Sequence, residues 1–425
     1  MSKLFHNPNL QSNVAFVLLE AAFIGILNTI DPFLPVFLTR LGATTFQVSM
    51  ITSMPAVAGL FLTIPAGQFL MNNPKILDWY RFPRLAFGVA YFLVAVIPFI
   101  FHTPKNSVLV ILAVLGIATF PTVIFMITFS IVMNAVAGPR GRYELMARRL
   151  TIIVLTSAVC MALSGWFLEQ FPFPLNYQYL FLILSIIGGS AVFYFASRIK
   201  LPETSKPQAR KVPIMDTLRG YQRILKENPT FSSFVWIRFV FILGLSTAIP
   251  LIPIYYVREA QASDAWIGAI NTVQLIIMVF GYTYWMRKAR GSMPNHTILL
   301  WTTLILGLYP ALIASTHQLF LIIIFAGLAY FFQAGLDLVF FDELMRLVPP
   351  EESIQYVSLA QSVQYIGTIG GPILGSIVAD WLGLAGALYV AAGIRILGFF
   401  LFFFRPESVP DDRRDGGIEQ TQPVG

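Results

Sequence analysis

Long, uninterrupted apolar runs constrain the fold of this chain more than any other feature of its sequence. Many of them are roughly 20 residues or longer, the length that an α-helix needs to cross the hydrocarbon core of a bilayer. Strands of a transmembrane β-barrel would instead alternate polar and apolar residues over segments of roughly ten. Only 12% of the residues are charged, whereas soluble domains carry about a quarter. The sequence therefore predicts an all-α membrane protein.

Charges, prolines and glycine turns divide the apolar sequence into twelve predicted transmembrane helices. They cover about 13–38, 45–70, 82–101, 107–136, 147–169, 177–197, 231–257, 264–286, 295–314, 317–347, 353–381 and 384–404. The longest polar stretch falls between the sixth and the seventh. Six spans, a linker and six spans is the simplest arrangement that accounts for this pattern.

The domain organisation follows from these boundaries. We expect an N-terminal six-helix bundle at 1–197 and a C-terminal six-helix bundle at 231–404. The linker at 198–230 is expected to be cytoplasmic and to contain a short amphipathic helix, because Leu218, Tyr221 and Leu225 share one helical face. The polar tail at 405–425 is expected to be cytoplasmic and disordered.

The distribution of basic residues predicts the orientation in the membrane. With the N-terminus in the cytoplasm, about 23 of the 28 Lys and Arg residues fall on the inner side, as the positive-inside rule requires. The outer loops then hold Arg40, Lys105 and Arg258. The net charge of +7 is therefore a topology signal and does not indicate nucleic-acid binding. We expect a multi-pass protein of the inner or plasma membrane, with both termini in the cytoplasm.

Residues that could form a metal or nucleophile site are sparse. Cys160 is the single cysteine, and the four histidines show no ligand spacing such as HExxH. We therefore expect no cofactor, no metal site and no enzymatic activity.

An internal repeat relates the two halves of the chain. The segment FVLLEAAFIGILNTIDPFLPVFLTRLG aligns with FVWIRFVFILGLSTAIPLIPIYYVREA at a constant offset of 218 residues. Pairs related by this offset are Pro32 with Pro250, Pro35 with Pro253, and Arg40 with Arg258. Proline kinks a spanning helix because it removes a backbone hydrogen bond. Duplication explains two matched kinks, although two apolar segments could each have acquired P-x-x-P independently. In duplicated transporters, substrate binds near the midplane between the repeats.

The pattern P-x-x-P-x(6)-G at Pro32, Pro35 and Gly42 resembles the opening of major facilitator superfamily proteins. The stretches GPRGRYELMARR and GTIGGPILGSIVADWLG are similar to the family as well. Within the family, the chain loosely resembles bacterial exporter-like members that move drugs or metabolites. The resemblance implies twelve helices in two pseudo-symmetric bundles, a monomer, and secondary transport of a small molecule by alternating access. It also implies that helices 1, 4, 7 and 10 line the central cavity.

The sequence departs from the family pattern in the loops after helices 2 and 8. The family signature there is a glycine followed by an Asp-Arg pair. Gly67 and Gly281 are present, but Met71 and Trp285 stand where the acid would be. A gating scheme based on that acid is therefore in doubt.

Five ionisable residues fall inside predicted spans, where charge is costly and marks candidate function. They are Glu20, Asp31, Arg238, Asp337 and Arg395. Glu20 and Arg238 are equivalent in the repeat. We predict an ion pair between them that opens and closes during transport, or alternatively a static pair that sets helix register.

Asp31 could carry a proton, or it could be a hydrated carboxylate at the outer interface. Asp337 could contact Arg148 or Arg149 as a gate at the inner end. Asp342 is a further gating candidate, although an i,i+4 pair with Arg346 is the simpler explanation. The sequence assigns no role to Arg395.

Uncharged amides in the same spans provide candidate ligand contacts. Helix position favours Asn28, Asn271, Gln274 and Gln333. The alternative is that these amides bond one helix to another.

These patterns predict a secondary transporter that exports a small, apolar or weakly charged solute by proton-coupled alternating access. Its expected partners are that solute, protons and the lipid bilayer, and no nucleic acid. The alternatives are a metabolite uptake carrier and a sensor or scaffold that keeps the carrier fold without transport.

Overall fold

A computed structural model describes residues 8–71, 73, 75–101, 103–201, 214–291, 293–349 and 352–405. The described residues form helices joined by short turns and connections, without strands. The predicted tail beyond Arg405 and most of the linker before Ile214 lie outside the described residues.

The first bundle contains helices from the N-terminal half of the chain. These are α1 (Pro8–Asn28), α2 (Ile30–Arg40), α3 (Thr45–Met71), α4 (Ile76–Ile100), α5 (Pro104–Leu168), α6 (Leu175–Leu184), the π-helical turn η1 (Ser185–Gly189) and α7 (Ser190–Arg198). The segment between the bundles forms α8 (Ile214–Glu227), whose apolar and polar residues separate strongly onto opposite faces.

The second bundle follows α8 and has the same helical plan. Its helices are α9 (Pro229–Arg258), α10 (Asp264–Gly291), α11 (Asn295–Ala314), α12 (Leu319–Leu347) and α13 (Ser353–Phe403). Helix α13 holds two spans, because Gly383 interrupts it with a φ of 76° that glycine adopts without steric cost.

Eleven helical runs are long and apolar enough to cross a membrane, and the run at Gln355–Phe403 is divided at Gly383. The predicted twelve-span fold is therefore confirmed. Helix α5 likewise provides two spans, at Pro104–Ala137 and Glu144–Leu168. The largest boundary error is at α4, which begins at Ile76 and not near residue 82. Arg84 stands near the start of the span predicted at 82–101 and was counted with the inner-side basic residues, but it is a buried residue of a spanning helix.

The first span is broken where the sequence predicts a kink. Helix α1 ends at Asn28, Thr29 is a turn, and α2 begins at Ile30. Pro32 has no N–H to donate to the carbonyl of Asn28, so the helical hydrogen-bond ladder loses a bond at this point. The repeat-related Pro250 and Pro253 lie inside α9, which continues through them as one helix.

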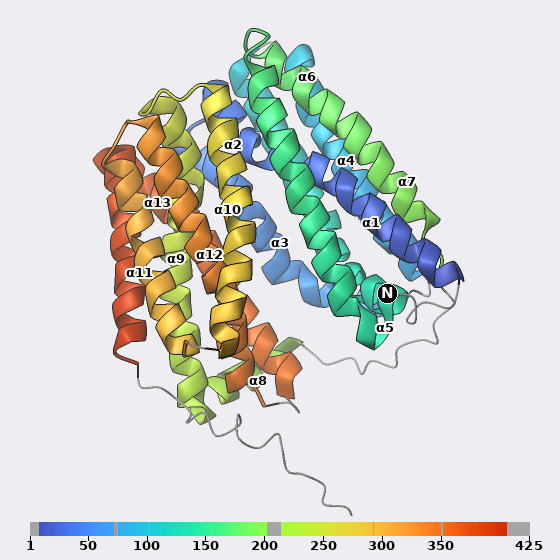
Figure 1. Cartoon of the computed structure of the whole chain (residues 1–425), viewed down its shortest axis with the longest axis vertical. Coiled ribbons are helices and arrows are strands. Elements are labelled where there is room, and N and C mark those ends of the chain that lie inside the picture. The colour runs from blue at the N-terminus through green and yellow to red at the C-terminus, as the bar shows by residue number, and fades with distance from the viewer. Residues whose placement is uncertain are drawn as a thin grey trace, which may run out of the picture.

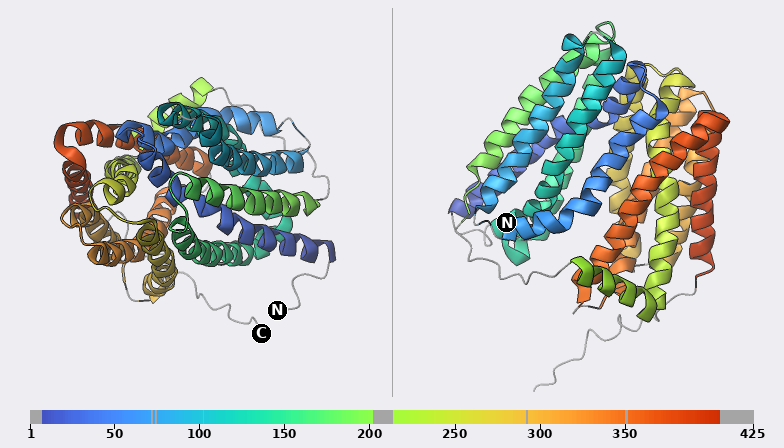
Figure 2. Two further views of the ribbon diagram at one scale, coloured as in Figure 1. Left: turned by 90° about the horizontal axis from the view of Figure 1, so that it is seen from above. Right: turned by 180° about the vertical axis from the view of Figure 1, so that it is seen from behind.

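The two bundles converge at one end of the molecule and diverge at the other (Figures 1 and 2). We call the diverging end, where α7 finishes and α8 lies, the linker end, and the opposite end the closed end. Helix α5 packs against α10, and α3 packs against α13, across the boundary between the bundles. A Cβ placed on Gly268 would lie 2.9 Å from Cα of Gly165, so these two glycines allow α5 and α10 to cross in backbone contact.

Large apolar side chains cover much of the outside of the molecule. Examples from both bundles are Phe61, Ile117, Leu163, Phe320 and Trp381, all more than half exposed. A water-soluble monomer rarely exposes such an extensive apolar surface, whereas a helix bundle in lipid does so by necessity. The chain is therefore a multi-pass membrane protein.

Candidate functional site

A cavity of about 400 Å³ lies between the two bundles. Its wall comes from α2 and α3 of the first bundle and from α9, α10, α11, α12 and α13 of the second. All four repeat-related prolines contribute to it: Pro32, Pro35, Pro250 and Pro253. The two proline-containing helices that the repeat relates, α2 and α9, thus meet at one shared site.

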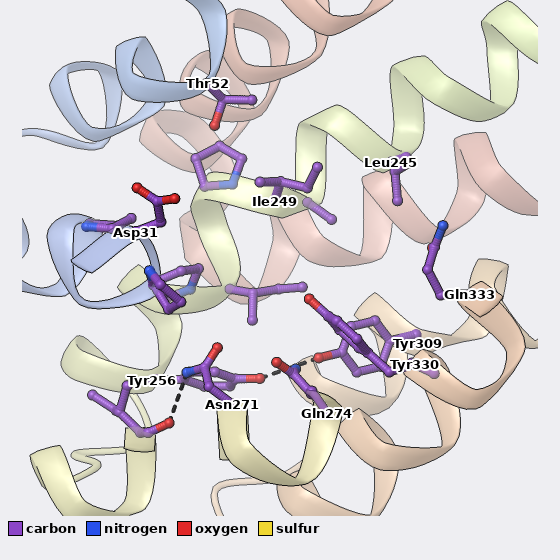
Figure 3. A pocket seen from close by; sticks show the side chains of 18 of the residues that line it. Asp31, Thr52, Leu245, Ile249, Tyr256, Asn271, Gln274, Tyr309, Tyr330 and Gln333 are labelled. Carbon is purple, nitrogen blue, oxygen red and sulfur yellow. Dashed lines mark hydrogen bonds between the residues drawn. The ribbon is translucent and has the colours of Figure 1, made fainter. Parts of the chain in front are cut away.

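Of the described acidic residues, Asp31 alone lines the cavity (Figure 3). It lies just after the break between α1 and α2, and it accepts a hydrogen bond from the hydroxyl of Tyr91 on α4. Its side chain is exposed within the cavity. The structure places Asp31 at the boundary between the bundles, and its depth relative to the outer interface stays a prediction.

The second bundle provides most of the polar groups in the cavity. The hydroxyls of Tyr256 and Tyr309 lie 3.3 Å apart. Gln274 is beside Tyr309, and Asn271 lies one turn away on α10, where its amide donates to the carbonyl of Ile267 at 2.8 Å (Figure 3). Asn271, Gln274 and Gln333 all line the cavity, whereas Asn28, the fourth predicted amide, does not.

Arg395 of α13 also lines the cavity, and the sequence assigned it no role. Only 1% of its surface is exposed. Its guanidinium carbon lies 5.4 Å from the ring centre of Phe241. The close approach of α9 and α13 at Gly244 accommodates its stem, because a Cβ there would lie 2.7 Å from Cγ of Arg395.

The predicted ion pair between Glu20 and Arg238 is absent from this structure. Glu20 is fully buried inside its own bundle, where its carboxylate lies 2.6 Å from Nε of Arg84. The hydroxyl of Tyr80 donates to both carboxylate oxygens, at 3.0 and 2.8 Å. Sequence reasoning missed this pair because it counted Arg84 with the basic residues of the inner side and not with the ionisable residues of the spans.

Arg238 lies in the second bundle and also finds its partners there. It donates to Oε1 of Gln364 at 2.7 Å, and its guanidinium lies 5.3 Å from the ring centre of Phe340. Neither Glu20 nor Arg238 lines the central cavity. Equivalent positions in the repeat placed the two residues at matching depth, but the helix rotation points each into its own bundle.

Asp337 is connected to the cavity through Gln333. The amide of Gln333 donates to Oδ1 of Asp337 at 2.7 Å, and the hydroxyl of Tyr282 donates to Oδ2 at 2.8 Å. These contacts join α10 to α12 within the second bundle.

The three predicted gating residues make contacts within their own bundles. Arg148 pairs with Glu144 on α5, and Asp342 pairs with Arg346 at 2.9 Å, which is the i,i+4 alternative that we considered. Arg149 is buried, with its guanidinium 4.6 Å from the ring centre of Phe129. A gate formed by these residues stays a prediction for a state in which the linker end is closed.

Contacts between the bundles occur at the closed end, and the sequence did not single them out. Arg40 pairs with Asp264 at 2.9 Å, and Asp264 also accepts a hydrogen bond from the hydroxyl of Tyr177. Arg258 donates to the carbonyl of Ala43 at 2.7 Å. We call these four side chains and the Ala43 carbonyl the closed-end latch.

The repeat contained a signal for the latch. Arg40 and Arg258 are equivalent residues, and each reaches across to the opposite bundle. The latch is nevertheless asymmetric, since the residue equivalent to Asp264 is Phe46. Arg40 and Arg258 are repeat-related basic residues in outer loops whose one other basic residue is Lys105, and this pairing could have indicated the latch.

Comparisons with known proteins agree with this architecture. Residues 234–424 match the sequence profile of the Major Facilitator Superfamily. No curated protein matches the chain. Among solved structures, a point mutant of the nucleoside transporter NupG has a TM-score of 0.68 at 16% identity, covering 94% of this chain and 100% of its own.

Two further structures extend the comparison. A bacterial homologue of the human lysosomal transporter Spinster, in an inward-facing and unoccupied conformation, has a TM-score of 0.66 at 11% identity, covering 94% of this chain and 97% of its own. The human organic anion transporter MFSD10 has a TM-score of 0.58 at 13% identity, with coverages of 93% and 100%. At these identities the similarity establishes the fold.

Two six-helix bundles around a central cavity, with repeat-related prolines on its wall, form an architecture that supports secondary transport by alternating access. The second bundle matches the Major Facilitator Superfamily model, and the whole chain shares its fold with the solved transporters described above.

Proposed function

We propose that this protein is a proton-coupled transporter that moves a small solute through the central cavity. The observation that carries the proposal is the position of Asp31. This carboxyl lies on the cavity wall at the proline-kinked helix α2, where the first bundle faces the second. A carboxyl that faces the cavity and accepts a hydrogen bond from Tyr91 can exchange protons with water that enters the cavity.

The positive-inside rule supports a cytoplasmic linker end. The state described here would then be open to the cytoplasm and sealed on the outside by the closed-end latch. Transport would require the latch to open and the linker end to close, and Asp31 would change its water access in that step.

Reconstitution into liposomes tests the proposal. The purified full chain is inserted into liposomes, and a pH gradient is imposed across the membrane. Labelled neutral, anionic and cationic aromatic solutes are then added one at a time. Both solute uptake and luminal pH are recorded. We expect at least one solute to drive proton movement that protein-free liposomes lack. Asp31→Asn should abolish the proton coupling while solute exchange without a gradient persists.

Asp380→Asn is the matched control, because Asp380 is an exposed aspartate of α13 that does not line the cavity. Its coupling should equal that of the unmodified protein. Unchanged coupling in Asp31→Asn would reject the assigned role of Asp31. The absence of flux for every solute would favour the sensor or scaffold alternative.

Export is our proposal for the direction of transport. The aromatic and apolar wall suits an amphiphilic solute that enters from the cytoplasm. Accumulation that reverses with the sign of the pH gradient measures the coupling direction: antiport supports export, and symport supports the uptake alternative.

A further inference from the structure

Arg395 combines three properties that no other arginine of the described residues combines. It is 1% exposed, it lines the central cavity, and no carboxylate or hydrogen-bond acceptor for it is found within the described part of the chain. Its contact is the face of Phe241, which offsets only part of the cost of burying a cation.

The other buried arginines of the spans illustrate the contrast. Arg84 is paired with Glu20 at 2.6 Å, and Arg238 donates to Gln364 at 2.7 Å. Desolvating a guanidinium without an anion is unfavourable, so such residues are commonly paired or serve a ligand. Arg395 therefore provides an unmatched positive charge at the cavity.

The neighbours of Arg395 indicate which ligand group could pair with its guanidinium. Tyr309 and Tyr256 bring hydroxyl groups to the same wall, and the Gln274 amide lies beside them (Figure 3). The guanidinium fork and hydroxyl donors are the groups that proteins use to bind a carboxylate. Prolines and aliphatic side chains form most of the remaining wall, which suits an apolar or aromatic body.

The opposite bundle limits the charge of the ligand. Asp31 faces the same cavity from α2, so a second anionic group directed toward that wall would be repelled. The volume of about 400 Å³ lies at the small end of ligand pockets. A compact monoanion fits both limits.

We propose that the substrate is a small organic monocarboxylate with an aromatic or aliphatic body, and that Arg395 binds its carboxylate. This inference rests on the proposed transport function and specifies its substrate class. The earlier expectation was an apolar or weakly charged solute. This inference specifies that the solute carries one negative charge and that this charge binds at Arg395.

Binding to the detergent-purified full chain tests this assignment without requiring transport. Benzoate, its neutral isostere benzamide, and the dianion phthalate are titrated by calorimetry. We expect benzoate to bind at least tenfold more tightly than either of the other two. Arg395→Gln should weaken benzoate binding at least tenfold and leave benzamide binding unchanged, and Arg395→Lys should retain part of the benzoate affinity.

Thermal unfolding without ligand separates this role from a structural one. Because Arg395 is a buried cation without an anion, Arg395→Gln should leave the melting temperature equal or higher. A structural role predicts a lower one. Arg346→Gln, at an exposed arginine of α12 outside the cavity, is the control and should keep full benzoate affinity.

Equal affinity for benzoate and benzamide, no benzoate binding, or undiminished benzoate binding in Arg395→Gln would each overturn the assignment. If Arg395→Gln does not fold, the assignment is tested by comparing benzoate with benzamide on the unmodified protein and on Arg395→Lys. The unmodified protein should prefer benzoate, and Arg395→Lys should keep only part of the benzoate affinity. Benzoate binding without flux would reject the transport function alone, and flux without anion preference would reject this inference alone.

Discussion

At the scale of single residues, burial and charge partners separate structural ionisable groups from functional ones. Glu20 is enclosed by Arg84 and Tyr80 and does not line the cavity. Asp31 and Arg395 do line it, and neither has a partner of opposite charge among the described residues. A paired buried charge fixes helix positions, whereas an unpaired charge at a cavity is available to a ligand or a proton.

Glu20→Gln should strongly destabilise the first bundle. The substitution leaves Arg84 buried without its carboxylate, near a second buried arginine, Arg149. Breaking a buried pair by removing one partner costs about 3–5 kcal/mol. We expect a clear fall in the thermal unfolding midpoint of the purified protein.

Asp78→Asn is the control for that experiment, because its pair with Arg81 is exposed and about 0–1 kcal/mol is at stake. If the two variants unfolded at the same temperature, the structural role of Glu20 would be refuted. A variant that unfolds normally but has lost coupling would restore the earlier hypothesis of a coupling role.

At the scale of helices, the prolines of α2 and α9 shape the cavity. All four lie on its wall, and the first span is interrupted directly before Pro32. The interruption costs helix stability, of the order of 3 kcal/mol for a proline in a helix interior. Pro250 and Pro253 lie on the opposite wall of the same cavity, inside the continuous helix α9.

Pro32→Ala should therefore lower the transport rate and leave the stability of the folded protein equal or higher. An alanine restores the missing N–H and favours a continuous helix from α1 into α2, which would displace Asp31. We expect at least a tenfold lower rate of solute transport in liposomes, with an unfolding midpoint that is equal or higher.

Pro98→Ala provides a comparison, since Pro98 lies inside α4 and does not line the cavity. Its transport rate should stay near that of the unmodified protein. Normal transport by Pro32→Ala would show that the kink is dispensable.

At the scale of the whole molecule, the closed-end latch holds the bundles together at one end. Arg40 and Asp264 form the ion pair, and Asp264 is 4% exposed. Hydrogen bonds to charged groups contribute about 1.5–3 kcal/mol, which corresponds to roughly a tenfold or larger shift between two states. The latch can therefore bias the equilibrium between the two access states.

Asp264→Asn should shift the population toward a state open at the closed end. The single cysteine simplifies the measurement: in a Cys160→Ser background, spin labels at Thr44 and Gln261 report the separation of the two bundles at that end. Both positions are exposed. We expect a second, longer distance to appear or grow.

Glu144→Gln removes an exposed i,i+4 pair with Arg148 elsewhere and should leave the distance distribution unchanged. An unaltered distribution in Asp264→Asn would mean that backbone packing, such as the contact of Gly165 with Gly268, holds this end without the latch.

The sequence alone determined the number of spans, the division into halves and the break in the first span. Hydrocarbon thickness sets a minimum length for each apolar run, and proline removes a backbone donor wherever it stands. Both constraints act locally, so they can be recognised without knowing which helices are neighbours.

Tertiary structure alone decided which polar side chains meet. Glu20 faces Arg84 and not Arg238, Arg395 reaches the cavity from the last span, and Arg40 meets Asp264 across the bundles. Hydropathy is nearly the same all round these helices, so the rotation of each helix is set by packing against its neighbours. That rotation assigns each charge to a partner, to lipid or to the cavity.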